Sequence, residues 1–173
     1  MSAGYWVPSP LGDIALRVED EVLTGVFFVG QKYYPSLMLG AGDAQAPRVV
    51  QQAHQELAEF FRGERRVFEV PFRAQGTPFQ RAVWEELSRI PYGEIVSYGD
   101  MARNMGLSPG HSRAVGSANG KNPISIIVPC HRVIGSSGDL TGYAGGVDRK
   151  RALLSLENAI GRPAGFEFEL TAN

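Results

Sequence analysis

Cysteine is almost absent from this sequence: Cys130 is the only one among 173 residues. A single thiol cannot close a disulfide within the chain, and it cannot supply the cysteine ligands of a structural zinc site. The disulfide-stapled and zinc-ribbon classes are therefore excluded. Whatever Cys130 does, it does without a second cysteine of its own chain.

Long apolar runs are absent as well, because no stretch reaches the roughly 18 apolar residues that a membrane-spanning helix needs. Residues 1–16, MSAGYWVPSPLGDIAL, lack the basic and apolar regions of a signal peptide. We therefore expect a cytoplasmic protein with no membrane partner.

An excess of charge of one sign is also missing, since 17 Lys+Arg face 18 Asp+Glu for a net charge of −1. Such a balance excludes a protein that binds DNA mainly through a large basic field. The halves differ, with a net charge of −3 over residues 1–72 and +2 over 73–173. This split weakly favours a polyanion on the second half, and scattered solvent-exposed charge explains it equally well.

The first part of the chain has the pattern of a small α/β domain over residues 1–72. Residues 13–18 and 22–29 are rich in Val, Ile and Phe and predict strands, and 66–72 predicts another. Residues 48–62 carry apolar side chains at helical spacing and predict a helix. Ala74-Gln75-Gly76 then predicts a joint to the next domain.

The second part, residues 77–160, is predicted to be mainly helical. Thr77 followed by Pro78 predicts one helix start, and Ser97 predicts the cap of a helix over 98–105. After a Pro-Gly turn, Ser112 is the expected cap of a short helix over 113–118, which makes a helix-turn-helix candidate. The pattern of residues 147–156 predicts the last helix, and 161–173 form a tail without an assigned structure.

Cys130 is a candidate nucleophile, although a lone cysteine in an apolar segment is more often a small buried hydrophobe. Pro129 fixes the approach of the chain, His131 offers a base, and the charge of Arg132 favours the thiolate. Since adjacent side chains diverge, we expect His131 to reach the sulfur through a water. The features together indicate a reactive thiol.

A catalytic histidine usually needs an acceptor that orients its ring. Glu157, at the end of the last predicted helix, is the candidate partner of His131. The alternative at this point is a solvent-facing carboxylate.

Residues 127–134, Ile-Val-Pro-Cys-His-Arg-Val-Ile, resemble the active-site signature of the O6-alkylguanine-DNA alkyltransferases, which repair DNA by direct reversal. The resemblance covers Thr77–Glu157, whereas residues 1–72 resemble the family's first domain only in length and in having strands before a helix. It implies a ribonuclease-H-like fold for that first domain. Further segments in the family's order and spacing are Phe79-Gln80, Val83-Trp84, 90–94, Ser97-Tyr98, 113–116, Asn122-Pro123, 141–146 and Glu157.

The resemblance implies a reaction in which the protein takes the alkyl group of O6-alkylguanine, and of O4-alkylthymine, onto its own cysteine. This SN2 displacement occurs once per molecule and needs no cofactor and no metal. By position, Cys130 is the acceptor, His131 is the base acting through a water, and Glu157 holds the His131 tautomer. The zinc site of some relatives' first domain cannot exist here, because its cysteines are absent.

Two further catalytic positions follow from the resemblance alone. Guanine is a poor leaving group as an anion, and Tyr98 stands where the family places the hydroxyl that protonates N3. Asn122 matches the asparagine that ties the recognition helix to the active-site turn.

The resemblance also assigns a substrate pocket. Backbone groups of Cys130 and Val133 are expected to accept hydrogen bonds from the exocyclic amine, with Pro129 beside them. Tyr143 packs on the alkyl group, and the backbone N–H of Ala144 reaches O6. Some members have serine in place of Ala144, so this chain keeps the N–H but lacks a pocket hydroxyl.

Double-stranded DNA is the implied partner, and its target base must be flipped out before sulfur can reach it. Arg113 is expected to enter the stack in place of the base. The small residues Ser112, Ala114 and Gly116 suit a helix in the minor groove, although a helix-turn-helix more often reads the major groove. Ser97 is also placed at the DNA, and molecules are expected to self-associate cooperatively along it.

Three alternatives remain from the sequence. The first is a non-catalytic lesion sensor of the same family. Such sensors lack the cysteine, so the presence of Cys130 argues against this class. A cysteine hydrolase built on Cys130, His131 and Glu157 would place its base directly on the sulfur. A transcription factor that uses only the helix-turn-helix would leave Pro129–Arg132 and Glu157 unexplained.

Overall fold

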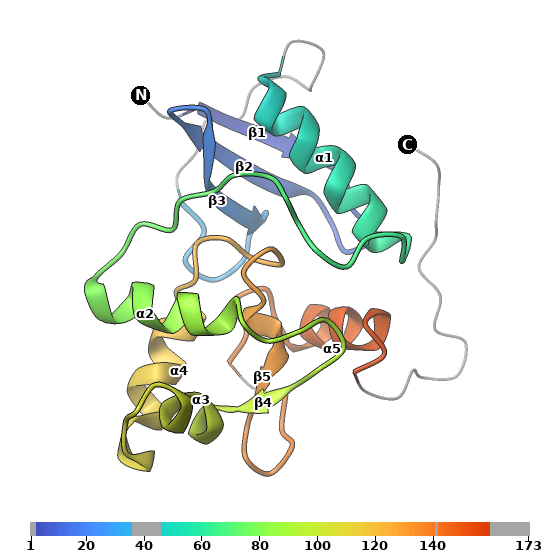
Figure 1. Cartoon of the computed structure of the whole chain (residues 1–173). Helices are drawn as coiled ribbons and strands as arrows, with labels where there is room; N and C mark the ends of the chain where they lie inside the picture. Colours follow the sequence, from blue (N-terminus) through green and yellow to red (C-terminus); the bar gives the residue numbers. More distant parts are fainter. Residues whose placement is uncertain (1–2, 36–45, 141, 160–173) are drawn as a thin grey trace.

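The computed structural model describes residues 3–35, 46–140 and 142–159. Its first part is an antiparallel sheet of β1 (Ala3–Val7), β2 (Ile14–Glu19) and β3 (Val22–Phe28), paired in that order. β2 and β3 are joined at Asp20 and Glu21, whose φ angles of 50° and 65° are those of a tight hairpin turn. The helix α1 (Arg48–Phe61) packs along this sheet, as Figure 1 shows.

The helix predicted over 48–62 is confirmed, because α1 buries the apolar face that its spacing indicated. The strand predicted over 66–72 is wrong. The buried carboxylate of Glu56 accepts the backbone N–H groups of Glu69 and Val70 at 2.9 and 3.1 Å, and those groups are then not available to a neighbouring strand. Only Phe72 keeps an isolated bridge, to Leu23 of β3.

The second part contains α2 (Pro78–Leu87), α3 (Tyr98–Asn104), α4 (Ser112–Gly120) and α5 (Val147–Leu156). Thr77 and Ser97 cap α2 and α3 as predicted, each in a reciprocal capping box. The predicted cap at Ser112 is wrong. Its hydroxyl donates to the Pro109 carbonyl at 2.8 Å, and α4 begins directly after the 3₁₀ turn Pro109–His111.

A short parallel pair brings distant segments together below the sheet. β4 (Val96–Ser97) pairs with β5 (Val133–Ile134). β4 leads directly into α3, and β5 follows the 3₁₀ turn Cys130–Arg132. The pair therefore sets the start of α3 beside the segment that carries the cysteine.

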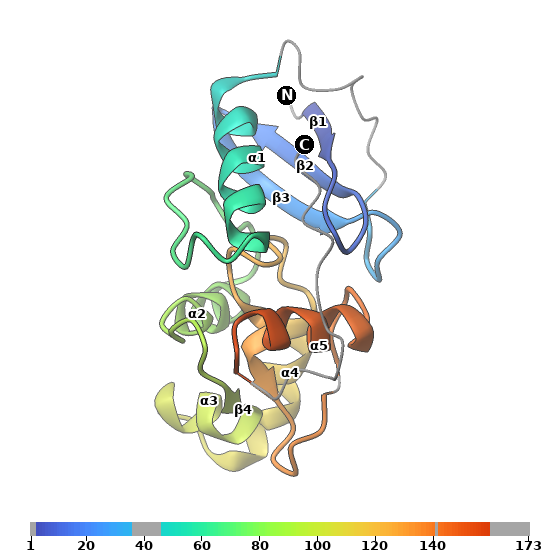
Figure 2. The ribbon, with the colours of Figure 1, turned by 90° about the vertical axis from the view of Figure 1, so that its right-hand side faces the viewer.

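The sheet and the helical part share one hydrophobic core. In both views the sheet with α1 lies at one end of the molecule and α2 to α5 lie at the other (Figures 1 and 2). Between them Val26 of β3 donates its N–H to the Pro123 carbonyl at 2.8 Å, and its own carbonyl accepts from Ser125 at 3.0 Å. The free edge of β3 thus fixes the segment that leads to Cys130. No helix of the described residues is long and apolar enough to cross a membrane.

That segment turns sharply at Ile126, whose φ of 72° is in the left-handed region that β-branched residues rarely adopt. The Val128 N–H donates to the Ile124 carbonyl at 2.9 Å and closes the turn. Such a conformation costs about 1–3 kcal/mol and persists only where its surroundings enforce it. Here β3 on one side and the buried Ile126 side chain on the other enforce it.

Replacing Glu56 by alanine is expected to lower the free energy of unfolding by about 1–3 kcal/mol, because two backbone N–H groups lose their acceptor. Urea unfolding followed by circular dichroism measures the change. Glu56→Gln keeps an acceptor oxygen and is the matched control, with a smaller expected loss. An equal loss in both variants would show that the charge, not the acceptor, is what matters.

Candidate functional site

Cys130 begins the 3₁₀ turn Cys130–Arg132 and is 4% exposed. Burial raises the pKa of its thiol to about 11, against the lowering effects of the Asn122 side chain and the Lys150 charge. The resting group is therefore a thiol. A reaction at this sulfur needs a partner that takes its proton.

His131 and Glu157 form a buried pair beside it. The His131 ring donates from Nε2 to Glu157 Oε2 at 2.7 Å, and both side chains are wholly shielded from solvent. Glu157 is therefore not the solvent-facing carboxylate of the alternative interpretation. His131 Nδ1 is buried and has no hydrogen-bond partner among the described residues. Because Nε2 carries the proton, Nδ1 is the nitrogen that can accept one.

Arg132 completes this buried group. Its guanidinium donates to both oxygens of Glu157, at 2.8 Å from Nε and 2.9 Å from Nη2, and from Nη1 to the Ile90 carbonyl at 2.7 Å. The sequence predicts that Arg132 favours the thiolate of Cys130. The structure instead directs its charge at Glu157, which the fork geometry of arginine matches.

These contacts decide the protonation states. Burial alone would raise the pKa of Glu157, but the charges and hydrogen bonds of His131 and Arg132 outweigh it and bring the pKa to about 2. Burial lowers the pKa of His131, and the attraction of Glu157 offsets this only in part. At neutral pH the group therefore holds an ionised Glu157, a charged Arg132 and a neutral His131.

The sequence gives little indication that Lys150 belongs to the site. Its side chain is fully buried on α5, and Nζ donates to the Val133 carbonyl at 2.5 Å. Burial lowers its pKa to about 8, which the charge of Cys130 partly offsets. One signal exists: Lys150 lies on the same helical stripe as Leu154 and Glu157.

Asn122 holds the turn that delivers Cys130. Its Nδ2 donates to the carbonyls of Val128 at 2.8 Å and Ile124 at 3.3 Å, and its Oδ1 accepts from the Ile124 N–H at 3.0 Å. The side chain also lowers the pKa of the Cys130 thiol, against the larger effect of burial. One buried amide thus fixes both ends of the Ile124–Val128 turn and the group that follows it.

Two tyrosines approach the thiol from other elements. Burial raises the pKa of Tyr98, at the start of α3, and so does the nearby charge of Cys130, while a hydrogen bond from Asn119 lowers it. Burial and Cys130 likewise raise the pKa of Tyr143, whose hydroxyl is buried without a partner among the described residues. The Tyr143 ring lies so close to Gly145 that a Cβ there would be 2.6 Å from it.

The remaining predicted residues divide into two groups. Pro129 and Val133 are buried next to Cys130, and the Ala144 carbonyl accepts from Lys32 at 3.0 Å. The predicted DNA-contact residues lie elsewhere, on α3 and α4, where Arg113 and Ala114 are exposed. Ser112 and Gly116 are half-buried on α4, and Ser97 is engaged as the cap of α3.

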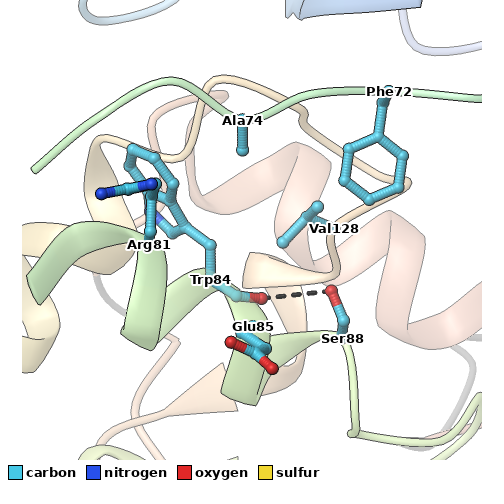
Figure 3. A pocket seen from close by; sticks show the side chains of 7 residues that line it. All are labelled: Phe72, Ala74, Arg81, Trp84, Glu85, Ser88 and Val128. Atoms are coloured by element: carbon cyan, nitrogen blue, oxygen red, sulfur yellow. Dashed lines mark hydrogen bonds between the residues drawn. The ribbon is translucent and has the colours of Figure 1, made fainter. Parts of the chain in front are cut away.

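A hollow of about 250 Å³ lies on the other side of Val128, between α2 and residues 72–74 (Figure 3). Its walls are mostly apolar, and none of the predicted site residues lines it. The residues that line the hollow are Phe72, Ala74, Arg81, Trp84, Glu85, Ser88 and Val128.

No group of His, Cys, Asp or Glu in the described part of the chain has the arrangement of a metal site.

Comparison with known proteins gives concordant results. The family described as 6-O-methylguanine DNA methyltransferase, DNA binding domain, matches residues 78–159. The methylated-DNA–protein-cysteine methyltransferase of Mycolicibacterium paratuberculosis is 50% identical over 151 residues, 87% of this chain and 89% of that protein.

Solved structures agree with the sequence relatives. The O6-methylguanine methyltransferase of Mycobacterium tuberculosis matches with a TM-score of 0.81 and 46% identity, over 95% of this chain and 96% of that chain. The Mycobacterium tuberculosis OGT in complex with DNA matches with a TM-score of 0.81 and 44% identity, over 91% of this chain and 93% of that chain.

Glu157 is expected to stabilise the fold in a pH-dependent way. Its pKa is about 2 in the folded state, below the ordinary value of 4.5, so its contribution is complete above about pH 4.5 and is lost as the pH falls toward 2. The difference in free energy of unfolding between the wild type and Glu157→Gln should therefore shrink between pH 5.5 and pH 3.5. Urea titrations at these pH values measure it, with the exposed Glu94→Gln as control. A difference that stays constant with pH would contradict this assignment.

Proposed function

This chain belongs to the methylated-DNA–protein-cysteine methyltransferases, and on that premise we propose that Cys130 takes the alkyl group of O6-alkylguanine, or of O4-alkylthymine, in double-stranded DNA. One observation carries the assignment. The reaction ends on a cysteine of the protein, and the only cysteine in this chain is buried and directly precedes the buried His131–Glu157 pair.

The proposed step is an SN2 displacement at the alkyl carbon. Sγ forms a bond to that carbon, the bond from carbon to O6 breaks, and its electron pair stays with the base. The thiol proton passes through a water to His131 Nδ1, while the Tyr98 hydroxyl gives a proton to N3 of the departing guanine. A thiolate is a softer nucleophile than a serine alkoxide and is better suited to displacement at this carbon. The thioether product does not revert, so each molecule reacts once.

The buried ion group supports the proton transfer. Arg132 neutralises Glu157, and Glu157 in turn fixes the His131 proton on Nε2. Nδ1 is then left as the acceptor. Lys150 adds a positive charge that favours the thiolate over the thiol. Asn122 holds the turn so that the sulfur stays in place.

The pocket for the base is proposed from the groups around the sulfur. The carbonyls of Cys130 and Val133 accept from the exocyclic amine; a carbonyl has two lone pairs, so the contact of Val133 with Lys150 leaves one available. Tyr143 packs on the alkyl group, Pro129 lies beside it, and the Ala144 N–H points at O6.

The DNA-binding element is proposed to be a helix-turn-helix formed by α3, the turn Pro109–His111 and α4. α4 enters the minor groove, where its small residues Ser112, Ala114 and Gly116 allow a close approach, and Ser97 contacts the backbone. Arg113 is exposed near the start of α4 and fills the place of the flipped base. The DNA complex of the similar Mycobacterium tuberculosis protein supports DNA as the partner.

The wider assignments are part of the same proposal. Residues 1–72 are a supporting ribonuclease-H-like domain, and residues 77–160 bind DNA and transfer the alkyl group. Residues 161–173 are a tail that lies outside the described residues. The protein works in the cytoplasm and self-associates cooperatively along DNA. The fixed edge of β3 under the Cys130 segment supports the assigned role of the first domain.

Incubation with an oligonucleotide that contains O6-methylguanine should increase the mass of the Cys130 peptide by one CH₂ group, about 14 Da, once per molecule. Tandem mass spectrometry of the digested protein measures the adduct. Cys130→Ala is the control and should bind the same DNA without an adduct. An unmodified Cys130 beside a persisting lesion would overturn the proposal, and turnover without an adduct would indicate a hydrolase.

Arg113→Ala should slow repair of duplex DNA by about 10-fold or more, because no side chain then fills the place that the flipped base leaves in the stack. Transfer from free O6-benzylguanine needs no flipping and should keep its rate. Single-turnover assays with both substrates make the comparison. Equal slowing would place Arg113 in the chemistry instead.

A further inference from the structure

Resting on the function proposed above, we propose that Arg149 is a positioning residue for alkyl transfer, because it ties the loop of residues 143–146 to the first part of the molecule. The proposed pocket places Tyr143 and the Ala144 N–H of this loop against the alkyl group and O6. Arg149 is half-buried on α5, directly after the loop. The family resemblance assigns it no role.

One guanidinium contacts both parts of the molecule. Nη1 of Arg149 donates to the Gly145 carbonyl in the loop at 3.1 Å, and Nε donates to the Leu11 carbonyl, between β1 and β2, at 2.9 Å. Cζ lies 4.6 Å from the centre of the Phe28 ring at the end of β3. Because a guanidinium is planar and its N–H groups have fixed directions, these bonds hold the two carbonyls in a fixed relation to each other.

A second bond fixes the loop to the same part. The Lys32 N–H, shortly after β3, donates to the Ala144 carbonyl at 3.0 Å, and within the loop the Gly146 N–H donates to the Tyr143 carbonyl at 3.0 Å. Three successive carbonyls of the loop are therefore engaged, two of them by groups outside it. The Ala144 N–H shares a peptide plane with the Tyr143 carbonyl, so its direction depends on how this turn is anchored.

Packing makes the same connection to the Tyr143 ring. A Cβ at Gly145 would lie 3.0 Å from the Phe28 ring and 2.6 Å from the Tyr143 ring, so the glycine backbone lies directly against both. Since Arg149 packs on Phe28, loss of the guanidinium also removes a contact of the ring that supports Tyr143 through the loop.

The position of this loop bears on the rate of the reaction. The transfer needs the sulfur, the alkyl carbon and O6 in line, and a displacement of about 1 Å can cost roughly 100-fold in rate. The thiol is held by other groups, since Asn122 fixes the turn before Cys130 and Glu157 fixes the residues after it. Loss of the Arg149 contacts is therefore expected to shift the substrate side of the reaction while the sulfur stays in place.

An arginine of a DNA-binding protein has a second interpretation, which is contact with a DNA phosphate. The printed geometry favours positioning, because the guanidinium of Arg149 is engaged by Leu11, Phe28 and Gly145. The proposed DNA-binding element, in contrast, is formed by α3 and α4. A substrate without phosphate separates the two interpretations.

The variant Arg149→Met removes the N–H donors and keeps an unbranched side chain. It should slow transfer from free O6-benzylguanine, and single-turnover transfer from a saturating O6-methylguanine oligonucleotide, by about 10- to 100-fold. Alkylation of Cys130 by iodoacetamide uses the thiol but not the base pocket and should keep its wild-type rate. The affinity for undamaged duplex DNA, measured by fluorescence anisotropy, should also be unchanged.

Two further variants control the comparison. Arg149→Lys can still donate to one of the two carbonyls and should recover part of the lost rate. Arg151→Met, the same change at an exposed position of α5, is the matched control and should stay within about 2-fold of the wild type in every assay. Circular dichroism checks that each variant is folded. If Arg149→Met does not fold, Arg149→Lys carries the comparison, with a smaller loss of transfer at an unchanged iodoacetamide rate.

Three results would overturn the proposal. Wild-type transfer from free O6-benzylguanine, together with weaker DNA binding, would indicate a phosphate contact. An equal change in transfer and in iodoacetamide alkylation would show that Cys130 itself has moved. Equal slowing by Arg149→Met and Arg151→Met would show an effect of charge alone. Each differs from failure of the proposed function, in which the wild-type protein forms no adduct from the oligonucleotide.

Discussion

The carboxylate of Glu157 is the contact on which the helical half depends. It accepts hydrogen bonds from the His131 ring and from two nitrogens of the Arg132 guanidinium. Arg132 also donates to the carbonyl of Ile90, in the segment that follows α2. A buried charge is costly unless paired and fully hydrogen-bonded, and here two partners meet that condition. The end of α5, the turn at Cys130 and the segment after α2 are therefore positioned by one group.

The same pairing sets the chemistry in the resting protein. Burial keeps the ring of His131 neutral, and the charge of Arg132 adds to this effect against the attraction of Glu157. The thiol of Cys130 is also neutral at rest, with its pKa raised to about 11 by burial. The resting site therefore holds two neutral groups, and reaction at the sulfur requires removal of the thiol proton.

Local signals were sufficient for some of the fold and failed where long-range contacts decide. The caps at Thr77 and Ser97 and the helix at 147–156 depend on neighbouring residues and are predictable from them. Residues 66–72 fail as a strand because Glu56, distant in sequence, takes their N–H groups, and β1 forms from a glycine-containing segment only through its pairing with β2. In the site, motif spacing pointed to Cys130, His131 and Glu157, but the direction of the Arg132 side chain and the burial of Lys150 depend on packing between elements.

The two backbone hydrogen bonds of Val26, with Pro123 and Ser125, join the sheet to the helical part and bear on whether the two parts can be separated. The sequence predicts a joint at Ala74-Gln75-Gly76, but the two parts meet along a strand edge and a common core, so a cut there separates elements that pack against each other. The isolated first part would expose the edge of β3, an open template for pairing with other chains. The isolated second part would lose the support that forces Ile126 into its left-handed turn. The sequence pattern therefore divides the protein into two regions, but a shared core and backbone hydrogen bonds join these regions in the structure.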